Sequence, residues 1–346
     1  MTAPNQTPIQ TPVLIWGSGA IGGILGAYFA RSGVPVHMVD IVAEHVAAMR
    51  TTGLHIEGPV EAFTQRLDAS TPDELTGQFE RVFLCVKAHH TAGAMEMLLP
   101  HIAPGGYVVS AQNGLNEIEI ANRIGVENTI GCFVNYGADW LDNGRILFGN
   151  RAAVAVGELD GSLSPRVHEI HALLQILEPE AVLTDNIWGY LWGKLGYGAL
   201  LIATALTPDS MSDAMDRDRH RIVYETLGTE VMRLAAAHGV TPMGFNGFDP
   251  QAFLQDDETA MRASLDAMVA HNRKTAKTHS GIWRDLAIRK RKTEVDAQVG
   301  VLVKMARDKG IKVPVLEQMC SLIRDVEEGR RVQSAELLDL MVPQCA

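Results

Sequence analysis

The chain has 346 residues, a hydrophobic content of 47% and a formal net charge of −11. This length is enough for two ordinary domains, and the negative charge argues against binding to nucleic acid or to an anionic membrane surface. The four cysteines, Cys85, Cys132, Cys320 and Cys345, are scattered without metal-ligand spacing. This pattern favours reduced thiols in a cytoplasmic protein over disulfides or a metal site.

Residues 1–12 are polar and proline-rich, with neither a basic region nor an apolar core. A signal peptide needs both features, so we expect a disordered tail here. The apolar stretch 13–30 is interrupted by five glycines, and the stretch 198–206 is too short to cross a bilayer. The sequence therefore predicts a cytoplasmic protein without a membrane span.

The segment 13–40 carries the strongest functional signal, because an apolar run, a glycine turn, a helix-like segment and a second apolar run follow one another. The turn consists of Gly17, Ser18, Gly19, Ala20, Ile21 and Gly22. Gly17 allows the tight turn, Gly19 lets the backbone approach a pyrophosphate, and Gly22 lets the helix pack closely on the strand. The helix N-terminus offers N–H groups to the phosphates. We therefore expect dinucleotide binding; a glycine-rich helix contact in an unrelated α/β core is the alternative.

Asp40 closes the second apolar run, 23 residues after Gly17, and indicates which coenzyme binds. A carboxylate at this position accepts hydrogen bonds from the ribose hydroxyls of NAD and would repel the 2′-phosphate of NADP. No arginine occurs at positions 41–45. We therefore predict NAD as the cofactor, with NADP less favoured. The alternative is that Asp40 is a surface acid that caps the next helix.

Strand-like and helix-like segments then alternate to about residue 157. After a broken stretch at 51–76, the expected elements are a strand at 81–88, a helix at 91–99, a strand at 107–110, a helix at 117–124 and strands at 129–135, 145–148 and 153–156. Asn143 and Gly144 form a hairpin turn signal. This order predicts an α/β fold with a doubly wound Rossmann sheet that finishes with antiparallel pairs.

Ligands of such sheets bind beyond the carboxyl ends of the strands, where two polar residues are expected. Lys87 ends an apolar strand, so its ammonium could meet cofactor phosphate or ribose, or simply face solvent. Asn113 could hydrogen-bond the nicotinamide ribose or a substrate oxygen. However, Asn113 and Gly114 are also an ordinary turn pair.

From residue 165 onward the chain shows almost no β-type alternation. Helices are expected at 166–177, 187–206, 216–238, 257–272, 285–309 and 314–329. The predicted domains are therefore a tail at 1–12, a Rossmann domain at 13–184 and an all-α substrate or catalytic domain at 185–346.

Two charged residues in the helical half are candidates for catalysis. Lys194 interrupts the otherwise apolar helix 187–206, where a lysine is costly to bury unless it is paired or functional. A snorkelling side chain is the alternative. Glu294 lies on the expected helix 285–309 beside apolar positions, and an exposed helix acid is its alternative explanation.

Taken together, these motifs resemble those of ketopantoate (2-dehydropantoate) reductases. The matching pieces are GSGAIGG in the first turn, VKAHHT at 86–91, QNG at 112–114, WGKL at 192–195 and RKTEVDAQVGVLVKMARDKGIKVP at 291–314. The resemblance implies a Rossmann domain, a C-terminal domain like that of 6-phosphogluconate dehydrogenase, and reduction of a 2-oxo acid to a 2-hydroxy acid.

The resemblance also implies roles for single residues. Lys194 matches the lysine that protonates the carbonyl oxygen, and Glu294 matches the acid that supports it and contacts the cofactor. Asn113 matches an asparagine that touches cofactor and substrate, and Lys87 matches a cofactor contact. The chemistry agrees, because hydride transfer develops negative charge on the carbonyl oxygen and an ammonium about 3 Å away stabilises and protonates it.

This chain departs from the family pattern around the substrate. Family members usually carry asparagines four and eight residues after the lysine, where this chain has Gly198 and Ile202. Their loss removes hydrogen bonds to a small polar substrate, each worth about 1 kcal/mol, and opens space beside Gly198. Ser280 matches the family's substrate-binding serine only approximately, and His279 is a further candidate substrate contact. The family's usual cofactor is NADPH, from which Asp40 also departs.

We therefore expect an NAD(H)-dependent oxidoreductase that acts on a secondary alcohol or ketone, either a 2-hydroxy acid or a larger, less polar substrate. The alternatives are an authentic 2-dehydropantoate 2-reductase of pantothenate biosynthesis and a non-catalytic NAD-binding regulator. The expected partner is the small-molecule substrate, and a homodimer is compatible with the large helical domain. No metal, nucleic acid or membrane partner is expected.

Overall fold

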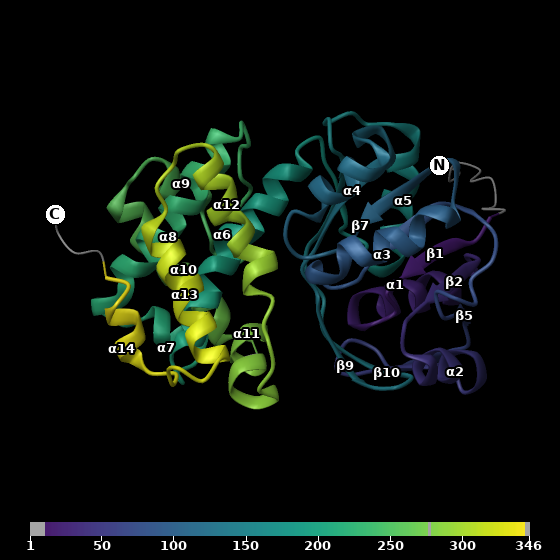
Figure 1. Ribbon diagram of the computed structural model, residues 1–346, viewed down its shortest axis with the longest axis horizontal. Coiled ribbons are helices and arrows are strands. Elements are labelled where there is room, and N and C mark those ends of the chain that lie inside the picture. Colours follow the sequence, from purple (N-terminus) through teal and green to yellow (C-terminus); the bar gives the residue numbers. More distant parts are fainter. Residues whose placement is uncertain (1–10, 276–277, 343–346) are drawn as a thin grey trace. The chain divides into compact units, whose positions relative to one another are not determined.

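The computed structural model describes residues 11–275 and 278–342. The chain divides into two compact units, Met1–Ile187 and Trp188–Ala346 (Figure 1). Most of the predicted tail at 1–12 lies outside the described residues. Thr11 is described, and its hydroxyl accepts a hydrogen bond from Arg81 Nη1 at 3.2 Å and donates one to Glu80 at 3.3 Å.

Unit 1 is organised around a mixed sheet which, within the described residues, has eight strands in the order β12-β11-β8-β7-β6-β1-β2-β5. The strands are β1 (Val13–Trp16), β2 (Val36–Val39), β5 (Asp68–Ser70), β6 (Phe79–Leu84), β7 (Ile102–Ser110), β8 (Thr129–Val134), β11 (Val154–Glu158) and β12 (Val182–Leu183). β11 pairs antiparallel with β8, whereas the other neighbours pair in parallel. This topology confirms the predicted doubly wound sheet. The expected antiparallel finish is only partly right, because β11 and β8 pair antiparallel but the expected strand 145–148 lies in a different sheet.

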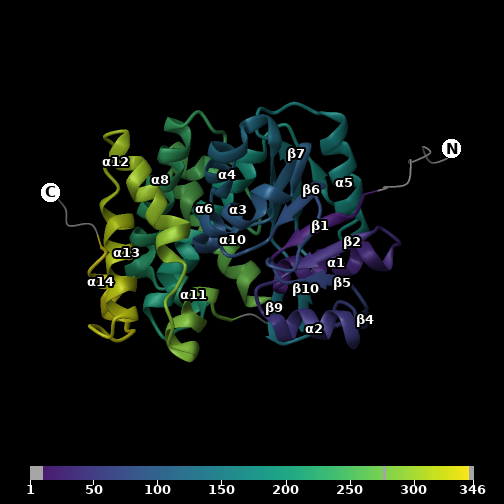
Figure 2. The same cartoon turned by 45° about the vertical axis from the view of Figure 1, so that its right-hand side comes forward.

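The apolar sequence of β1 follows from burial on both faces of this sheet. Val13 and Ile15 belong to the core formed with helices α1 (Ala20–Arg31) and α5 (Pro165–Leu177). Leu14 and Trp16 belong to the core formed with α3 (Thr91–Leu98) and α4 (Asn116–Ile124), on the opposite face (Figure 2). Because side chains alternate between the faces of a strand, helices on both sides require an apolar residue at every position.

Unit 1 also contains a second, smaller sheet, which the sequence analysis did not predict. Among the described residues it has four strands in the order β4-β3-β10-β9, namely β4 (Phe63–Gln65), β3 (Leu54–Glu57), β10 (Arg145–Asn150) and β9 (Gly137–Asp142). The sheet packs on α1, where a Cβ added to Gly23 would overlap Ile146 and approach Leu54. The predicted turn at Asn143 and Gly144 is confirmed, because β9 and β10 pair antiparallel and Gly144 has φ +79°.

Unit 2 is helical. Its helices are α6 (Ile187–Ala203), α7 (Met211–Met215), α8 (Asp218–Ala237), α9 (Pro250–Leu254), α10 (Glu258–Arg273), α11 (Gly281–Arg284), α12 (Val301–Asp308), α13 (Pro314–Glu327) and α14 (Ala335–Asp339). Extended pairing in the part of unit 2 that the structure describes is limited to one bridge between Phe245 and Phe248. The predicted all-α character is therefore confirmed, although the helix expected at 216–238 begins only at Asp218, after a break that follows α7.

The continuous helix expected at 285–309 is wrong. A π-helical turn covers Asp285–Arg289, Lys290 adopts a left-handed conformation with φ +49°, and helical structure resumes only near Val295. Hydrogen bonds to Asp285 stabilise this break, because its buried carboxylate accepts one from Arg289 Nη1 at 3.0 Å and one from Arg291 Nε at 2.9 Å. Glu294 consequently lies just before the renewed helix and not inside one.

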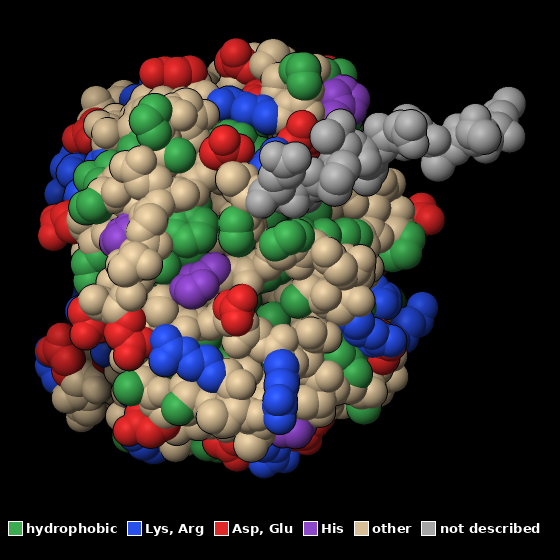
Figure 3. Space-filling model, turned by 90° about the vertical axis from the view of Figure 1, so that its right-hand side faces the viewer, with side chains coloured by type: hydrophobic (Ala, Val, Ile, Leu, Met, Phe, Trp, Pro, Cys, Tyr) green, Lys and Arg blue, Asp and Glu red, His purple; other side chains and the backbone are tan. Residues whose placement is uncertain are grey.

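The surface of unit 1 carries both signs of charge. On the face drawn in Figure 3, Lys and Arg side chains alternate with Asp and Glu side chains and with hydrophobic ones. Ion pairs of unit 1 include Arg31 with Glu61 at 2.6 Å and Arg145 with Glu57 at 2.5 Å. No helix within the described ranges combines the length and the hydropathy needed to cross a membrane.

Candidate active site

The glycine turn after β1 has the geometry that its sequence predicts. Gly17 has φ +94°, and a Cβ there would lie 2.8 Å from Val86 Cγ1. A Cβ on Gly22 would overlap the carbonyl oxygen of Gly17, so the helix approaches the turn as closely as expected. A Cβ on Gly19 would meet no described heavy atom within 4 Å. The backbone at Gly19 is therefore open to a ligand, which is the condition for a pyrophosphate to approach.

Ser18, between the first two glycines, is fully buried and held at three points. Its N–H donates to Asp40 Oδ2 at 3.0 Å, and its hydroxyl donates to the Val39 carbonyl at 3.0 Å. Its carbonyl oxygen lies 2.9 Å from Nε2 of His45 on α2 (Ala43–Thr51). The turn is thus anchored to the end of β2 and to α2 before any ligand binds. Sequence analysis did not single out His45.

Asp40 is half-buried and uses both carboxylate oxygens to organise the loop after β2. Oδ2 accepts the Ser18 N–H and Oδ1 accepts the Val42 N–H, both at 3.0 Å. Each oxygen keeps a second acceptor site, since a carboxylate has about four in all. Ile41, the next residue, is 71% exposed. An acid with spare acceptor capacity beside an open apolar side chain fits an adenosine ribose and its base.

The loops after β6 and β7 are tied together by buried polar side chains. Gln112 Nε2 donates to the Val86 carbonyl and to Thr91 Oγ1, both at 2.8 Å. Thr91 in turn donates to Asn116 Oδ1 at 2.9 Å. Sequence reasoning missed this network, although Gln112 and Thr91 lie inside the two quoted motifs QNG and VKAHHT.

Lys87 and Asn113 project from these tied loops. β6 ends at Leu84, so Lys87 lies in the loop beyond the strand and not on it. Both side chains are exposed, and the Asn113 carbonyl accepts from Asn116 Nδ2 at 2.7 Å. The structure therefore brings Lys87 and Asn113 to the same carboxyl edge of the sheet as the glycine turn.

Lys194 is half-buried on α6, between two glycines that allow close packing. A Cβ on Gly193 would overlap the Met243 carbonyl oxygen, and a Cβ on Gly196 would lie 2.5 Å from Met232 Cε. The surrounding segments therefore fix the position of this part of α6. The small residues around the lysine are the sequence signal for this packing. The sequence analysis interpreted them only as part of an apolar helix.

One and two turns after Lys194, the helix presents the residues that replace the family's asparagines. A Cβ on Gly198 would have no described heavy atom within 4 Å, which confirms the predicted open space. Ile202 is 3% exposed and packs in the core. Neither position offers a polar group to a ligand from its side chain.

Glu294 is half-buried at the start of a helical segment. The buried Thr293 beside it accepts the Val295 N–H at 3.2 Å, and the Thr293 N–H and hydroxyl both donate to Glu327 Oε1 on α13. These bonds hold the backbone on either side of Glu294. The TE pair of the last motif thus consists of a helix-capping threonine and the candidate functional acid.

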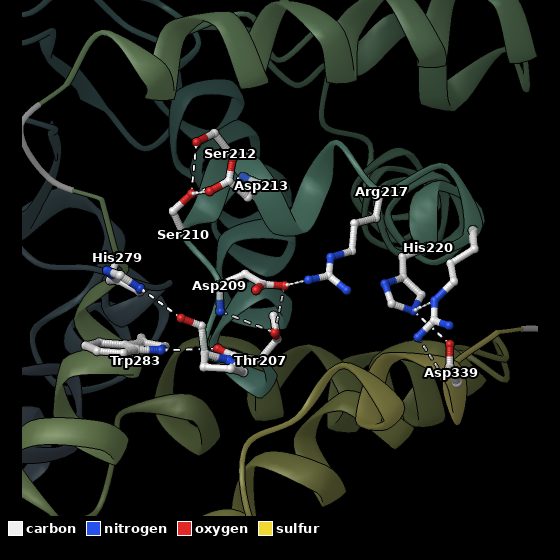
Figure 4. A network of polar contacts seen from close by, with 12 residues as sticks. Thr207, Asp209, Ser210, Ser212, Asp213, Arg217, His220, His279, Trp283 and Asp339 are labelled. Carbon is white, nitrogen blue, oxygen red and sulfur yellow. Dashed lines mark hydrogen bonds and ion pairs between the residues drawn. The ribbon is translucent and has the colours of Figure 1, made fainter.

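Ser280 is buried and caps α11, because its hydroxyl accepts the Trp283 N–H at 3.2 Å. His279 stacks on the Trp283 ring with a centroid separation of 3.8 Å. His279 Nε2 lies 3.3 Å from the Pro208 carbonyl, and Trp283 Nε1 donates to the Thr207 carbonyl at 3.2 Å (Figure 4). These contacts dock α11 on the turn after α6. They give His279 and Ser280 structural roles, while their contact with substrate stays a prediction.

No group of three or more His, Cys, Asp or Glu side chains in the described ranges could hold a metal ion. The polar side chains in Figure 4 instead form ion pairs and hydrogen bonds with one another or with the backbone. Asp209 pairs with Arg217 at 2.5 Å, and the buried ring of His220 lies 2.8 Å from Asp339 on α14. These contacts join α8 to the turn that precedes α7 and to α14.

Two family models match the chain. The model of Ketopantoate reductase PanE/ApbA matches residues 13–161, and the model of Ketopantoate reductase PanE/ApbA C terminal matches residues 186–327. The chain is also 26% identical over 316 residues to the 2-dehydropantoate 2-reductase of Halobacterium salinarum, with 90% of this chain and 97% of that relative covered.

Solved structures share the fold. The ternary structure of D-mandelate dehydrogenase with NADH and anilino(oxo)acetate matches with a TM-score of 0.79 at 18% identity, covering 92% of this chain and 98% of that chain. The dimeric ketopantoate reductase from Staphylococcus aureus matches with a TM-score of 0.69 at 17% identity, covering 92% and 100%.

Proposed function

The chain belongs to the ketopantoate reductase family of oxidoreductases, and from this membership we propose that it is an NAD(H)-dependent enzyme that interconverts a 2-oxo acid, or a related ketone, with the corresponding alcohol. The observation that carries the proposal is the position of Asp40. This residue directly follows β2, and its carboxylate accepts the N–H of Ser18 in the glycine turn. The position is the one where a dinucleotide-binding fold recognises ribose hydroxyls.

The residues of unit 1 fit a nicotinamide dinucleotide. The backbone N–H groups at the start of α1 would hold the pyrophosphate beside the open Gly19, and Asp40 would accept from the ribose hydroxyls. Lys87 and Asn113, at the same edge of the sheet, would contact the cofactor, with Asn113 also touching the substrate. When bound, the nicotinamide supplies or accepts the hydride.

Lys194 is the proposed proton donor and acceptor. In the reducing direction its ammonium stabilises the negative charge that develops on the carbonyl oxygen and then releases a proton from Nζ to that oxygen. In the oxidising direction the neutral amine takes the proton from the alcohol. Glu294 supports the lysine and contributes to cofactor binding. Half-burial of both side chains limits the water that would compete for these contacts.

The substrate is proposed to be larger or less polar than ketopantoate. The open space at Gly198 and the apolar side chain of Ile202 replace two amides that would hold a small polar molecule. The fold likeness to a D-mandelate dehydrogenase, with its anilino(oxo)acetate complex, supports a 2-oxo acid that carries a bulky aryl group. His279 and Ser280 remain proposed substrate contacts.

An authentic 2-dehydropantoate 2-reductase is the second candidate, and the name of the Halobacterium salinarum relative favours it. A non-catalytic NAD-binding regulator is a third candidate, but the retained Lys194 and Glu294 speak against it. The dimeric Staphylococcus aureus neighbour supports the proposal that the chain forms a homodimer.

Steady-state kinetics with NADH distinguishes the two enzymatic candidates. Ketopantoate and phenylglyoxylate, an aryl 2-oxo acid, are compared as substrates of the purified protein. We expect kcat/KM for phenylglyoxylate to exceed that for ketopantoate by at least tenfold. Efficient NADPH-dependent reduction of ketopantoate would establish the second candidate instead, and binding of NADH without turnover of any 2-oxo acid would favour the regulator.

A further inference from the structure

We propose that His45 is a positioning residue for dinucleotide binding. Its imidazole, with one hydrogen bond to Ser18 and one to Gly144, forms a link that we name the His45 clamp. The clamp joins the phosphate-binding turn to the β9–β10 hairpin and holds the turn in the conformation that receives the pyrophosphate. The inference rests on the proposed function, since it concerns the same dinucleotide site.

The hydrogen bonds of His45 define its tautomer. The ring is 1% exposed, and the Gly144 N–H donates to Nδ1 at 2.9 Å. A ring nitrogen that accepts an N–H carries no proton, so the proton of the neutral ring is on Nε2. Nε2 can then donate to the Ser18 carbonyl oxygen, 2.9 Å away. Both bonds of the clamp therefore require the neutral ring with its proton on Nε2.

The clamp connects parts of the chain that are far apart in sequence. Gly144 lies 99 residues after His45 and forms the tip of the β9–β10 hairpin, whereas Ser18 lies 27 residues before it. Trp140 on β9 covers the ring edge-on, with a centroid separation of 5.9 Å and an interplanar angle of 80°. Without His45, the buried Ser18 carbonyl would lose its acceptor bond, and an unsatisfied buried carbonyl favours rearrangement of the turn.

Protonation opposes the clamp. A cationic ring carries an N–H on Nδ1, which would point at the Gly144 N–H and replace an attraction with a repulsion. Charged groups on the elements that pack against the ring are Asp40 at the end of β2, Glu44 on α2, and Asp139, Asp142 and Arg145 of the hairpin. Arg145 is already paired with Asp142 at 2.9 Å and with Glu57. A proton on Nδ1 is therefore incompatible with the hydrogen bond from the Gly144 N–H.

The test compares NADH dissociation constants of the full chain and its variants, measured by fluorescence at pH 8. In His45→Gln the amide oxygen and nitrogen replace the ring acceptor and donor without titrating, and His45→Leu offers neither group. At pH 8 we expect the leucine variant to bind NADH roughly tenfold more weakly and the glutamine variant to stay within about threefold of the parent.

His55→Gln is the matched control, because His55 lies on β3 of the same small sheet and its ring bonds the exposed hydroxyl of Thr64 at 2.7 Å. Its NADH dissociation constant should equal that of the parent. The inference is overturned if His45→Leu binds NADH as the parent does, or if His45→Gln binds NADH as weakly as His45→Leu. If the leucine variant does not fold, the glutamine variant decides, and a loss of affinity well beyond threefold overturns the inference. A parent protein that binds neither NADH nor NADPH would overturn the proposed function, and this inference with it.

Discussion

Lys194 is the residue on which the proposed chemistry depends. Replacement by alanine removes the only proposed proton donor while leaving the turn after β1 untouched. We expect kcat to fall by a factor of about 10² to 10⁴, with little change in the NADH dissociation constant. Stopped-flow or steady-state rates and a fluorescence titration measure the two quantities. Lys304→Ala, at an exposed position of α12, is the control and should keep full activity.

Asp40 sets the proposed coenzyme preference. In Asp40→Asn the repulsion of a 2′-phosphate disappears, while an amide oxygen still accepts one backbone N–H. We expect the ratio of kcat/KM for NADH to that for NADPH to drop by about tenfold, equivalent to roughly 1.4 kcal/mol. Asp68→Asn, an exposed position on β5, should leave the ratio unchanged. An unchanged ratio in Asp40→Asn would remove the basis for the predicted NAD preference.

At the scale of residues, roles that depend on a local sequence motif were predicted, whereas roles that depend on tertiary contacts were not. The turn and packing roles of Gly17 and Gly22 follow from a contiguous pattern, because the glycine-specific geometry is decided within a few residues. His45 and Gln112 were not recognised, since their partners come from other elements and no local spacing marks them. The helix-capping role of Ser280 was likewise hidden, because the helix it begins is only one turn long.

At the scale of elements, α6 offers a matched pair of glycine substitutions. A Cβ at position 193 would overlap the Met243 backbone carbonyl, which cannot move as a side-chain tip can. We expect Gly193→Ala to destabilise the protein by about 2 kcal/mol or more. Gly198→Ala enters open space and should be neutral or stabilising by up to about 1 kcal/mol, because alanine favours helix. Urea unfolding measures both, and equal effects would contradict the packing described for α6.

A buried acid links α8 to the start of α13. Glu230 accepts the N–H groups of Val315 and Leu316 at 3.0 and 2.8 Å, and burial raises its pKa above the ordinary 4.5 even though these bonds lower it. Between pH 4.5 and the raised pKa, Glu230 is therefore protonated in the folded protein and ionised in the unfolded chain. The associated stability is present below pH 4.5 and is lost as the pH rises through the raised pKa.

We accordingly expect the melting temperature of the parent, relative to Glu230→Gln, to decrease as the pH rises from 4.5 towards 7. Glutamine cannot titrate, so it lacks this contribution to the pH dependence. Glu180→Gln, at an exposed position of unit 1, is the control. A melting-temperature difference that is independent of pH, or that grows in the opposite direction, would contradict the assigned pKa direction.

Elements were predictable where their periodicity was long and uninterrupted. The buried strands around β1 and the helix α6 have largely apolar sequences, because elements that are buried on all sides need apolar residues at nearly every position. The strands β3 and β4 were missed because they are four and three residues long and only partly buried. The prediction of a helix at 285–309 was wrong because the buried Asp285 accepts hydrogen bonds from two arginines and Lys290 adopts a left-handed conformation. The spacing of apolar residues carries no information about either feature.

At the scale of the whole molecule, the order of motifs along the chain was the strongest guide. The resemblance rested on five separated segments, and the two family models cover residues 13–161 and 186–327. The fold class is therefore confirmed, whereas coenzyme, substrate and site roles remain proposals. These properties depend on a few side chains, such as Asp40 and Gly198, that differ from the family pattern and leave the fold unchanged.

The central claim is that the chain transfers a hydride between a nicotinamide and a carbonyl carbon with help from Lys194. Reduction of a 2-oxo acid with NADH that carries two deuterium atoms at C4 tests it directly, with mass spectrometry of the product. The account predicts one deuterium on the carbinol carbon with the parent protein, and the same labelled product formed at least about 10²-fold more slowly with Lys194→Ala. A 2-hydroxy acid without deuterium, or undiminished labelling by the variant, would contradict it.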